Sequence, residues 1–221
     1  MSRPREFDQS AALDRAVDAF WERGYDGAAV QDLCSAMDLN PGSLYGAFGD
    51  KRALFLAVLD RYMDTVSRLA IDCIGGAPSG MLGIRAFFDN LVTAMTGGKR
   101  RWGCLVTNSI AELSLRDPQI AEKVKLHLGR VEMAFAGALA RARTEGELAQ
   151  GIGPESAAFL VCVLQGLNVL AKTKPGREVL QGIVDVALKT LAPNVSTPAS
   201  RKKRQRTLAR PARKRLKPGS L

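Results

Sequence analysis

The sequence predicts an all-α fold with two folded parts, a three-helix N-terminal head and a larger helical domain, followed by a basic tail. Apolar residues recur at helical spacing in successive segments up to residue 191, and no segment shows the alternation typical of a strand. At 221 residues and 46% hydrophobic composition, the chain can bury one small and one larger core. After residue 192 the apolar spacing stops and basic residues dominate.

The first predicted helix spans residues 8–23. Its apolar side chains fall on one face, and the glycine at position 24 ends it. The residues of this face are Leu13, Ala16, Val17 and Phe20. We expect this face to cover the core of the head.

Two short helices joined by a tight turn are predicted next. Val30, Leu33 and Met37 give the first of them an apolar face, and the turn falls at Asp38 and Leu39. The second spans roughly residues 41–47 and is marginal alone, so it must dock on its neighbours.

The second short helix has clear start and stop signals. Asn40 can cap it through its side-chain oxygen, and Pro41 occupies the first helical position, where a missing N–H is tolerated. Gly49 and Asp50 end this helix and cap the next. The docking residues are Leu44 and Phe48, and the residues left facing outward are Asn40, Pro41, Gly42, Ser43 and Tyr45. This is the arrangement of a DNA-binding helix-turn-helix.

The head resembles the DNA-binding domain of the TetR/AcrR family of one-component transcriptional repressors. The resemblance rests on two segments, ALDRAVDAFWERGYDG and NPGSLYGAFGDKRALF, and covers residues 3–59. It departs where Ala28 and Ala29 replace the usual Thr or Ser cap, and where Asp38 replaces the usual Gly of the turn. Aspartate tolerates a left-handed backbone, so we expect the turn to be retained. The resemblance implies a homodimer whose two recognition helices enter successive major grooves of an inverted-repeat operator.

The outward face of the second short helix supplies the predicted DNA contacts. Pro41 offers apolar contact to a thymine methyl group, and Gly42 allows close backbone approach. Lys51, at the start of the next helix, is placed to bind a phosphate. The complete predicted DNA-binding set is Arg3 and Arg5 of a basic arm, Asn40, Pro41, Gly42, Ser43, Tyr45 and Lys51. The alternatives are that Tyr45 only packs and that Lys51 is a solvated surface charge.

The predicted domains are a DNA-binding head in residues 1–55 and an effector-binding and dimerisation domain in residues 56–192. The first helix of the larger domain begins near residue 50 and ends in the hexapeptide GGAPSG, residues 75–80. Its apolar series is Leu54, Phe55, Val58, Leu59, Tyr62, Val66 and Leu69. The remaining helices are predicted at residues 81–96, 104–115, 118–144, 155–172 and 177–191.

Residues 157–171 form a helix that is apolar nearly all round, so we expect it to be buried on every side. Such burial would be achieved if this helix and the predicted helix at residues 177–191 packed against the same two helices of a second chain in a four-helix bundle. The partner predicted from this feature is therefore a second copy of the chain.

Cys104, Asn108 and Glu112 form one stripe of a helix, at i, i+4 and i+8. The family resemblance implies that this central helix lines an effector cavity, with Asn108 and Glu112 as polar groups that fix a small molecule. The predicted walls of the cavity are Phe87, Leu91, Met95, Cys162 and Gln165. The alternatives are a solvated face for the stripe and plain core packing for the walls.

Cys104 has a second interpretation. It opens a helix directly after KRRWG, and both a helix N-terminus and neighbouring cations favour a reactive thiolate. Some relatives that resemble this chain here sense electrophiles or oxidants through a cysteine. The alternative function of the protein is therefore a cysteine-based electrophile- or redox-sensing repressor. The alternative role of Cys104 itself is that of a small buried apolar residue.

The net charge of +10 is concentrated at one end of the chain. Residues 193–221 hold ten Lys or Arg and no Asp or Glu, which leaves 22 basic and 22 acidic residues in the rest. The tail is predicted to be disordered and to bind DNA phosphates without reading sequence, or else only to aid solubility. A non-specific DNA-coating, nucleoid-type protein is the alternative function of another class.

Other classes of function are disfavoured by composition. The four cysteines show no C-x-x-C spacing and the chain has one histidine, so we predict no metal, no cofactor and no catalytic triad. We also expect no signal peptide and no membrane span, which places the protein in the cytoplasm. The sequence predicts a ligand-responsive transcriptional repressor and not an enzyme.

Overall fold

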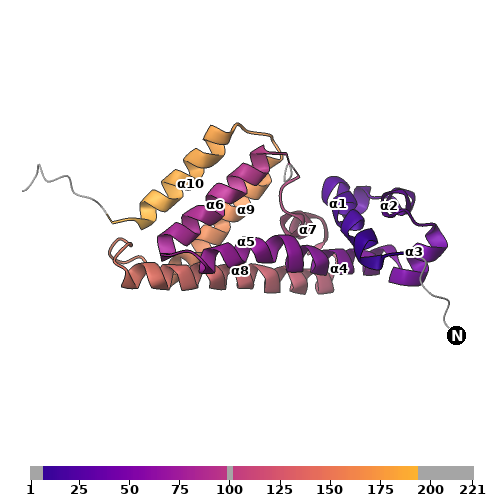
Figure 1. The fold of residues 1–221 in the computed structure, drawn as a ribbon, viewed down its shortest axis with the longest axis horizontal. Coiled ribbons are helices and arrows are strands. Elements are labelled where there is room, and N and C mark those ends of the chain that lie inside the picture. The colour runs from indigo at the N-terminus through magenta and orange to yellow at the C-terminus, as the bar shows by residue number, and fades with distance from the viewer. Residues whose placement is uncertain (1–6, 99–101, 194–221) are drawn as a thin grey trace, which may run out of the picture.

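The computed structural model of the protein describes residues 7–98 and 102–193. Within these ranges the chain forms helices and turns and no strand, which confirms the all-α prediction. The head consists of α1 (Gln9–Gly27), α2 (Val30–Met37) and α3 (Pro41–Phe48). Figure 1 shows the head at one end of an elongated molecule, with the other helices forming a body.

Local signals set the helix ends of the head as predicted. Asp38 adopts the left-handed conformation, with φ 56°, in the turn between α2 and α3. Asn40 caps α3, because its Oδ1 accepts a hydrogen bond of 2.8 Å from the backbone N–H of Ser43. Gly49, at φ 86°, ends α3, and the side chain of Asp50 caps the helix that follows.

The connector from head to body is a continuous helical segment with a π-helical turn in its middle. It comprises α4 (Lys51–Tyr62), η1 (Met63–Ser67) and α5 (Arg68–Gly75). An uninterrupted helix would align Leu69 with the buried series, but Leu69 is 72% exposed. A π turn closes i→i+5 hydrogen bonds, so it adds a residue and rotates the side chains that follow it. The apolar spacing did not predict this turn.

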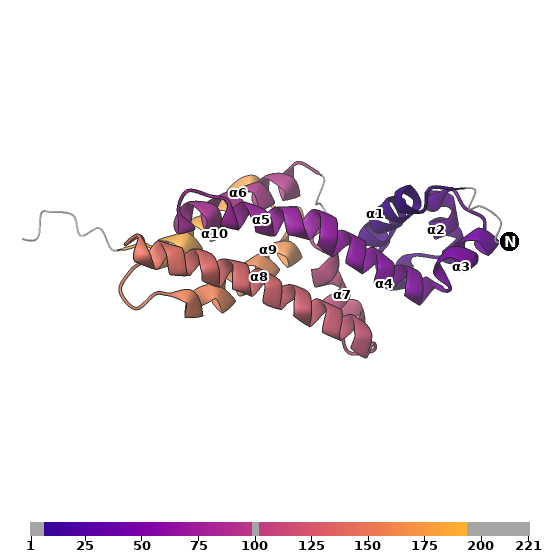
Figure 2. The ribbon, with the colours of Figure 1, turned by 60° about the horizontal axis from the view of Figure 1, so that its bottom comes forward.

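The body consists of α6 (Gly80–Thr96), α7 (Leu105–Leu113), α8 (Pro118–Thr144), the short 3-10 turn η2 (Pro154–Ser156), α9 (Ala157–Ala171) and α10 (Arg177–Leu191). These helices lie within a few residues of their predicted positions. In Figures 1 and 2 the connector runs beside α8, and α6, α9 and α10 gather at the end away from the head. The short helix α7 contacts both α1 of the head and α8 of the body.

The head shares its core with α7 and the start of α8. The cluster of buried side chains that contains Phe20 and Phe55 also contains Val106 of α7 and Val124 of α8. A second cluster fills the body, where the rings of Phe88 and others pack between α6, α8, α9 and α10. A movement of α7 would therefore change packing contacts in the head as well as in the body.

Helix α9 is not buried on every side in the single chain, contrary to expectation. Its inner face is buried, whereas Phe159 and Val169 are 43% and 57% exposed. The stretch Pro154–Ala171 also corrects the expectation about membrane spans. By length and composition alone it is apolar enough to cross a membrane, with a mean hydropathy of 1.4 and 33% of its residues buried.

Candidate nucleic-acid interface and interior cavity

Helix α3 presents a free outer face at the tip of the head. Leu44 is fully buried and anchors the helix, and Phe48 is half-buried beside it. Of the predicted contact residues on this helix and its cap, Asn40, Pro41, Gly42 and Tyr45 are exposed and Ser43 is half-buried. An exposed short helix held by a buried leucine is what insertion into a major groove requires.

Lys51, the first residue of α4, is positioned by an aromatic ring. Its Nζ lies 4.6 Å from the ring centroid of Tyr25, within the range of a cation–π interaction. Tyr25 itself packs edge-on against Phe55 of the head core. The ammonium is therefore held at the N-terminal end of α4, next to α3. The other two predicted cations, Arg3 and Arg5, lie outside the described residues.

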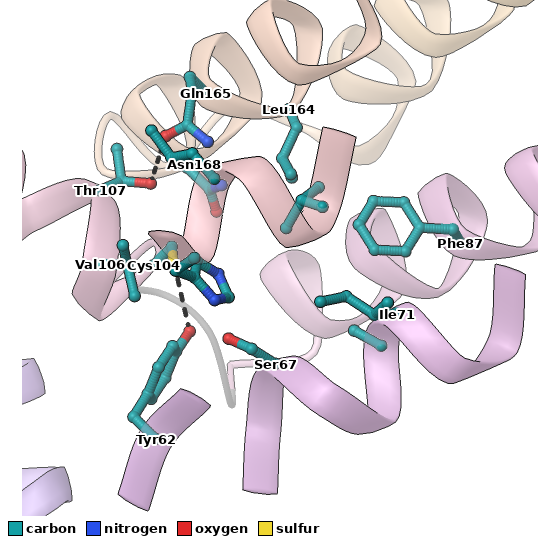
Figure 3. A pocket seen from close by; sticks show the side chains of 14 residues that line it. Tyr62, Ser67, Ile71, Phe87, Cys104, Val106, Thr107, Leu164, Gln165 and Asn168 are labelled. Carbon is teal, nitrogen blue, oxygen red and sulfur yellow. Dashed lines mark hydrogen bonds between the residues drawn. The ribbon is translucent and has the colours of Figure 1, made fainter. Parts of the chain in front are cut away.

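A partly enclosed cavity of about 30 Å³ lies where the connector, α7, α8 and α9 meet. Figure 3 shows it from close by. Its apolar lining residues are Ala70, Ile71, Phe87, Val106, Leu128, Val131 and Leu164. Its polar lining residues are Tyr62, Ser67, Cys104, Thr107, His127, Gln165 and Asn168. Half of the lining residues are therefore polar, and they include both Tyr62 and Ser67 of the connector.

Two hydrogen bonds join neighbouring elements across the cavity wall. The hydroxyl of Tyr62 donates to Sγ of Cys104 at 3.4 Å, which links α4 to the residue that caps α7. The hydroxyl of Thr107 donates to Oε1 of Gln165 at 2.7 Å, which links α7 to α9. These contacts satisfy four of the polar lining groups.

His127 is a deeply shielded titratable group of the cavity. Its side chain is 5% exposed, and burial lowers its pKa from 6.5 to about 4, with Arg130 adding to the shift through charge repulsion. The imidazole is therefore neutral at physiological pH. The sequence analysis assigned the single histidine to no site. The buried positions 120, 124, 127, 131 and 135 of α8 follow helical spacing and identify its face.

The cavity gathers three of the eight predicted effector residues, namely Phe87, Cys104 and Gln165. The other five lie elsewhere. Leu91 and Met95 pack in the core of the body, Cys162 is exposed on the outer side of α9, and Asn108 and Glu112 point toward the head. Four polar lining residues besides His127 were not predicted, and these are Tyr62, Ser67, Thr107 and Asn168.

Both ends of α7 are fastened to the head by hydrogen bonds that involve side chains. The indole N–H of Trp21 donates to the carbonyl oxygen of Gly103 at 3.0 Å, and Oε2 of Glu112 accepts a bond of 2.7 Å from the backbone N–H of Tyr25. Gly103 has φ 79°, and a Cβ there would lie 2.7 Å from the backbone oxygen of Asn168. Only glycine allows this close passage between α1 and α9.

Two family models match the chain. The model described as bacterial regulatory proteins, tetR family, matches residues 12–58, and the model described as tetracyclin repressor-like, C-terminal domain, matches residues 80–185. The first match contains α2 and α3, and the second contains α7, α8 and α9. Together the two matches cover more than half of the chain.

Curated relatives and solved structures are similar over most of their length. The uncharacterized HTH-type transcriptional regulator YezE of Bacillus subtilis (strain 168) is 32% identical over 86% of this chain and 100% of that protein. The HTH-type transcriptional repressor ComR of Escherichia coli (strain K12) is 29% identical over 85% of this chain and 90% of that protein. A cysteine mutant of the TetR family transcriptional regulator CifR, complexed with 26-bp double-strand operator DNA, is 37% identical, with a TM-score of 0.74 over 85% of this chain and 98% of that chain.

Acidification is expected to destabilise the protein through His127. Because the folded-state pKa of about 4 lies below the ordinary value of 6.5, the unfolded chain takes up the proton first as the pH falls. This group leaves the free energy of unfolding unchanged above pH 6.5 and lowers it by up to ~3 kcal/mol between pH 6.5 and 4. Urea unfolding of the wild type and His127→Gln across this interval measures the effect. The variant should lose less stability than the wild type, and parallel losses would contradict the assignment.

Proposed function

Because the chain belongs to the tetR family of bacterial regulatory proteins, we propose that it is a homodimeric repressor that releases an inverted-repeat operator when a small molecule enters its interior cavity. Family membership makes it a transcriptional regulator with a DNA-binding helix-turn-helix. The ligand response, the dimer and the operator symmetry are the finer parts of the proposal. The observation that carries it is the shared wall, since Tyr62 and Cys104 line the cavity and also join the connector to α7.

The DNA-binding part of the proposal assigns α3 to the major groove. Tyr45 is 45% exposed at the outer face and is free to reach a phosphate through its hydroxyl. Lys51 is held beside the same face by Tyr25 and supplies a second phosphate contact. The similar regulator CifR has been solved on double-strand operator DNA, which supports the same target here. A cytoplasmic location follows from this target.

The ligand response is proposed to start with displacement of the cavity walls. A volume of about 30 Å³ holds roughly two water molecules, so a larger occupant must push the side chains that enclose it. Tyr62 and Ser67 belong to the connector that carries the head, and Cys104 follows the glycine that holds Trp21. A coupling of about 1–3 kcal/mol through these contacts gives a 5–150-fold loss of operator affinity.

The dimer part of the proposal rests on an apolar face formed by α9 and α10. Side chains that are 39–66% exposed line it, and these are Phe159, Val169, Leu170, Val179 and Val186. Gly166 and Gly182 lie in the same helices with open space around their α-carbons, which leaves room for a partner's helices. A two-fold interface that pairs this face with its own copy would bury it.

A second candidate function is sensing through the Cys104 thiol. Cys104 caps α7, lines the cavity and accepts the hydrogen bond of Tyr62. An electrophile that reaches the cavity and bonds to this sulfur would remove the Tyr62 contact and change the wall directly.

The predicted basic tail adds a contribution that the structure does not describe. Residues 194–221 lie outside the described residues, so a phosphate-binding role for the tail stays a prediction from the sequence. The same holds for Arg3 and Arg5. If the protein protected all DNA evenly, whatever its sequence, the tail and not the head would dominate DNA binding.

Tyr45→Ala and Lys51→Ala are each expected to weaken operator binding by about 1–3 kcal/mol, because each removes a phosphate contact. Footprinting upstream of the chain's own gene locates the operator, and fluorescence anisotropy then measures the affinity. Lys189→Ala, on α10 far from the head, is the matched control and should bind as the wild type does. Wild-type affinity in both head variants, or uniform protection of all DNA, would contradict the docking proposal.

Val186→Asp is expected to convert the dimer to a folded monomer. Val186 is 66% exposed in the single chain, so an aspartate there is tolerated by the fold but not within an apolar interface. Sedimentation velocity gives the mass, and circular dichroism checks the fold. Leu69→Asp, at a 72% exposed position of α5, is the control that should stay dimeric. A dimeric Val186→Asp would move the interface to another face.

N-ethylmaleimide distinguishes the two kinds of ligand response. If sensing is covalent, the Cys104 sulfur adds across the maleimide double bond, its proton passes to the neighbouring carbon, and the operator is released. Mass spectrometry locates the adduct, and Cys104→Ser should then keep the operator bound. Release that persists in Cys104→Ser would exclude a thiol-based response at this position.

A further inference from the structure

Three polar side chains of the interior cavity have no hydrogen-bond partner among the described residues. Oδ1 of Asn168 is fully shielded and unpaired, on a residue that is 2% exposed. The imidazole of His127 and the hydroxyl of Ser67, on residues 5% and 7% exposed, also line the cavity without a partner in the described chain. They come from α9, α8 and η1, three separate elements that meet only here.

Unpaired polar groups at such depth are unfavourable unless something bonds to them. Buried polar atoms in folded proteins almost always have a partner, supplied by the chain, by water or by a ligand. Figure 3 shows the hydroxyls of Tyr62 and Ser67 and the amide of Asn168 turned toward the same interior space. Asn168 Oδ1 supplies one acceptor, and the neutral imidazole of His127 and the hydroxyl of Ser67 each supply a donor and an acceptor, so these three groups offer at least three acceptors and two donors to one occupant.

The charge of the lining restricts the occupant further. The fourteen residues around the cavity include no Asp, Glu, Lys or Arg. A charged ligand would lose its hydration here without meeting an opposite charge, which is strongly unfavourable. An entirely apolar ligand would leave all three polar groups unpaired. The lining therefore disfavours both charged ligands and entirely apolar ligands.

We propose that the cavity binds a small uncharged molecule that donates a hydrogen bond to Asn168 Oδ1 and accepts one from Ser67 or His127. This is the chemistry of a small carboxamide or alcohol, and the proposal rests on the effector role assigned to the cavity above. Because the volume of about 30 Å³ holds roughly two water molecules, the ligand must be small, and a compound of a few heavy atoms already displaces the side chains of the wall. The inference therefore names the chemical class of the effector.

Three planar molecules of equal heavy-atom count test this class. Acetamide carries the donor and the acceptor, acetate carries a charge, and isobutene carries neither. His127 is the sole histidine of the chain, so its imidazole ¹H–¹⁵N signals report occupancy of the cavity without overlap. Acetamide should shift these signals saturably in the millimolar range and at least tenfold more tightly than the other two. Equal or tighter binding of isobutene, or no saturable shift with acetamide, would falsify the proposal.

Asn168→Leu tests the role of the unpaired oxygen. The leucine removes a buried unpaired acceptor at similar volume, so the melting temperature should rise while the preference for acetamide over isobutene disappears. Asn90→Leu, at an exposed position of α6, is the matched control and should change neither property. Should Asn168→Leu not fold, Ser67→Ala provides the same comparison with a smaller change. Retained acetamide preference in the folded variants would overturn the assignment.

Operator binding in the absence of any ligand separates this inference from the proposed function. A protein that binds acetamide but no specific DNA site keeps the cavity assignment and loses the repressor assignment. A protein that binds one operator but shows no acetamide preference keeps the repressor assignment and loses the ligand class. Both measurements use the full chain.

Discussion

The carbonyl oxygen of Gly103 and the sulfur of Cys104 are the contacts on which the rest of this structure depends. The first accepts the indole N–H of Trp21 from the head, and the second accepts the hydroxyl of Tyr62 from the connector. Two consecutive residues thus hold both segments that carry the DNA-binding helix. Tyr62 and Cys104 also line the cavity, so the second of these bonds forms part of its wall. The edge-to-face contact between the rings of Trp21 and Tyr62 joins the two bonds into one cluster.

The π-helical turn Met63–Ser67 explains how one connector serves the head and the cavity at once. Upstream of it, α4 turns Leu54, Phe55 and Val58 into the core of the head. Downstream, the rotated face turns Ile71 toward the cavity. A regular α-helix could not satisfy both environments with this sequence, because their faces are out of register by one residue. The hydrogen bonds of a π turn are weaker than those of a regular α-helix, so the connector bends most easily at this turn.

Features set by neighbouring residues could be predicted from the sequence, and features set by packing could not. The caps at Asn40 and Asp50 and the left-handed Asp38 depend on residues within one helical turn, so the sequence analysis predicted them. The stripe Cys104, Asn108 and Glu112 was recognised, but where each residue points depends on how α7 lies between the head and the body. Cys104 meets the cavity, whereas Glu112 bonds to the backbone of Tyr25. The spacing of apolar residues does not indicate the π turn. For that reason the sequence analysis did not predict the cavity residues that this turn positions.

The exposed apolar face of α9 and α10 is better explained by a second copy of the chain than by a lipid bilayer. A single helix that crosses a membrane exposes its whole circumference to lipid, whereas the inner face of α9 is already packed through Leu160 and Leu167 in the core of the body. Polar contacts also fix α10 on α6, since Gln181 donates to Asp89 and Arg85 pairs with Asp185. These bonds fix α10 on the body while its apolar residues Val179 and Val186 stay exposed. Two fixed helices that present small and apolar residues together form a surface suited to a rigid, self-complementary partner.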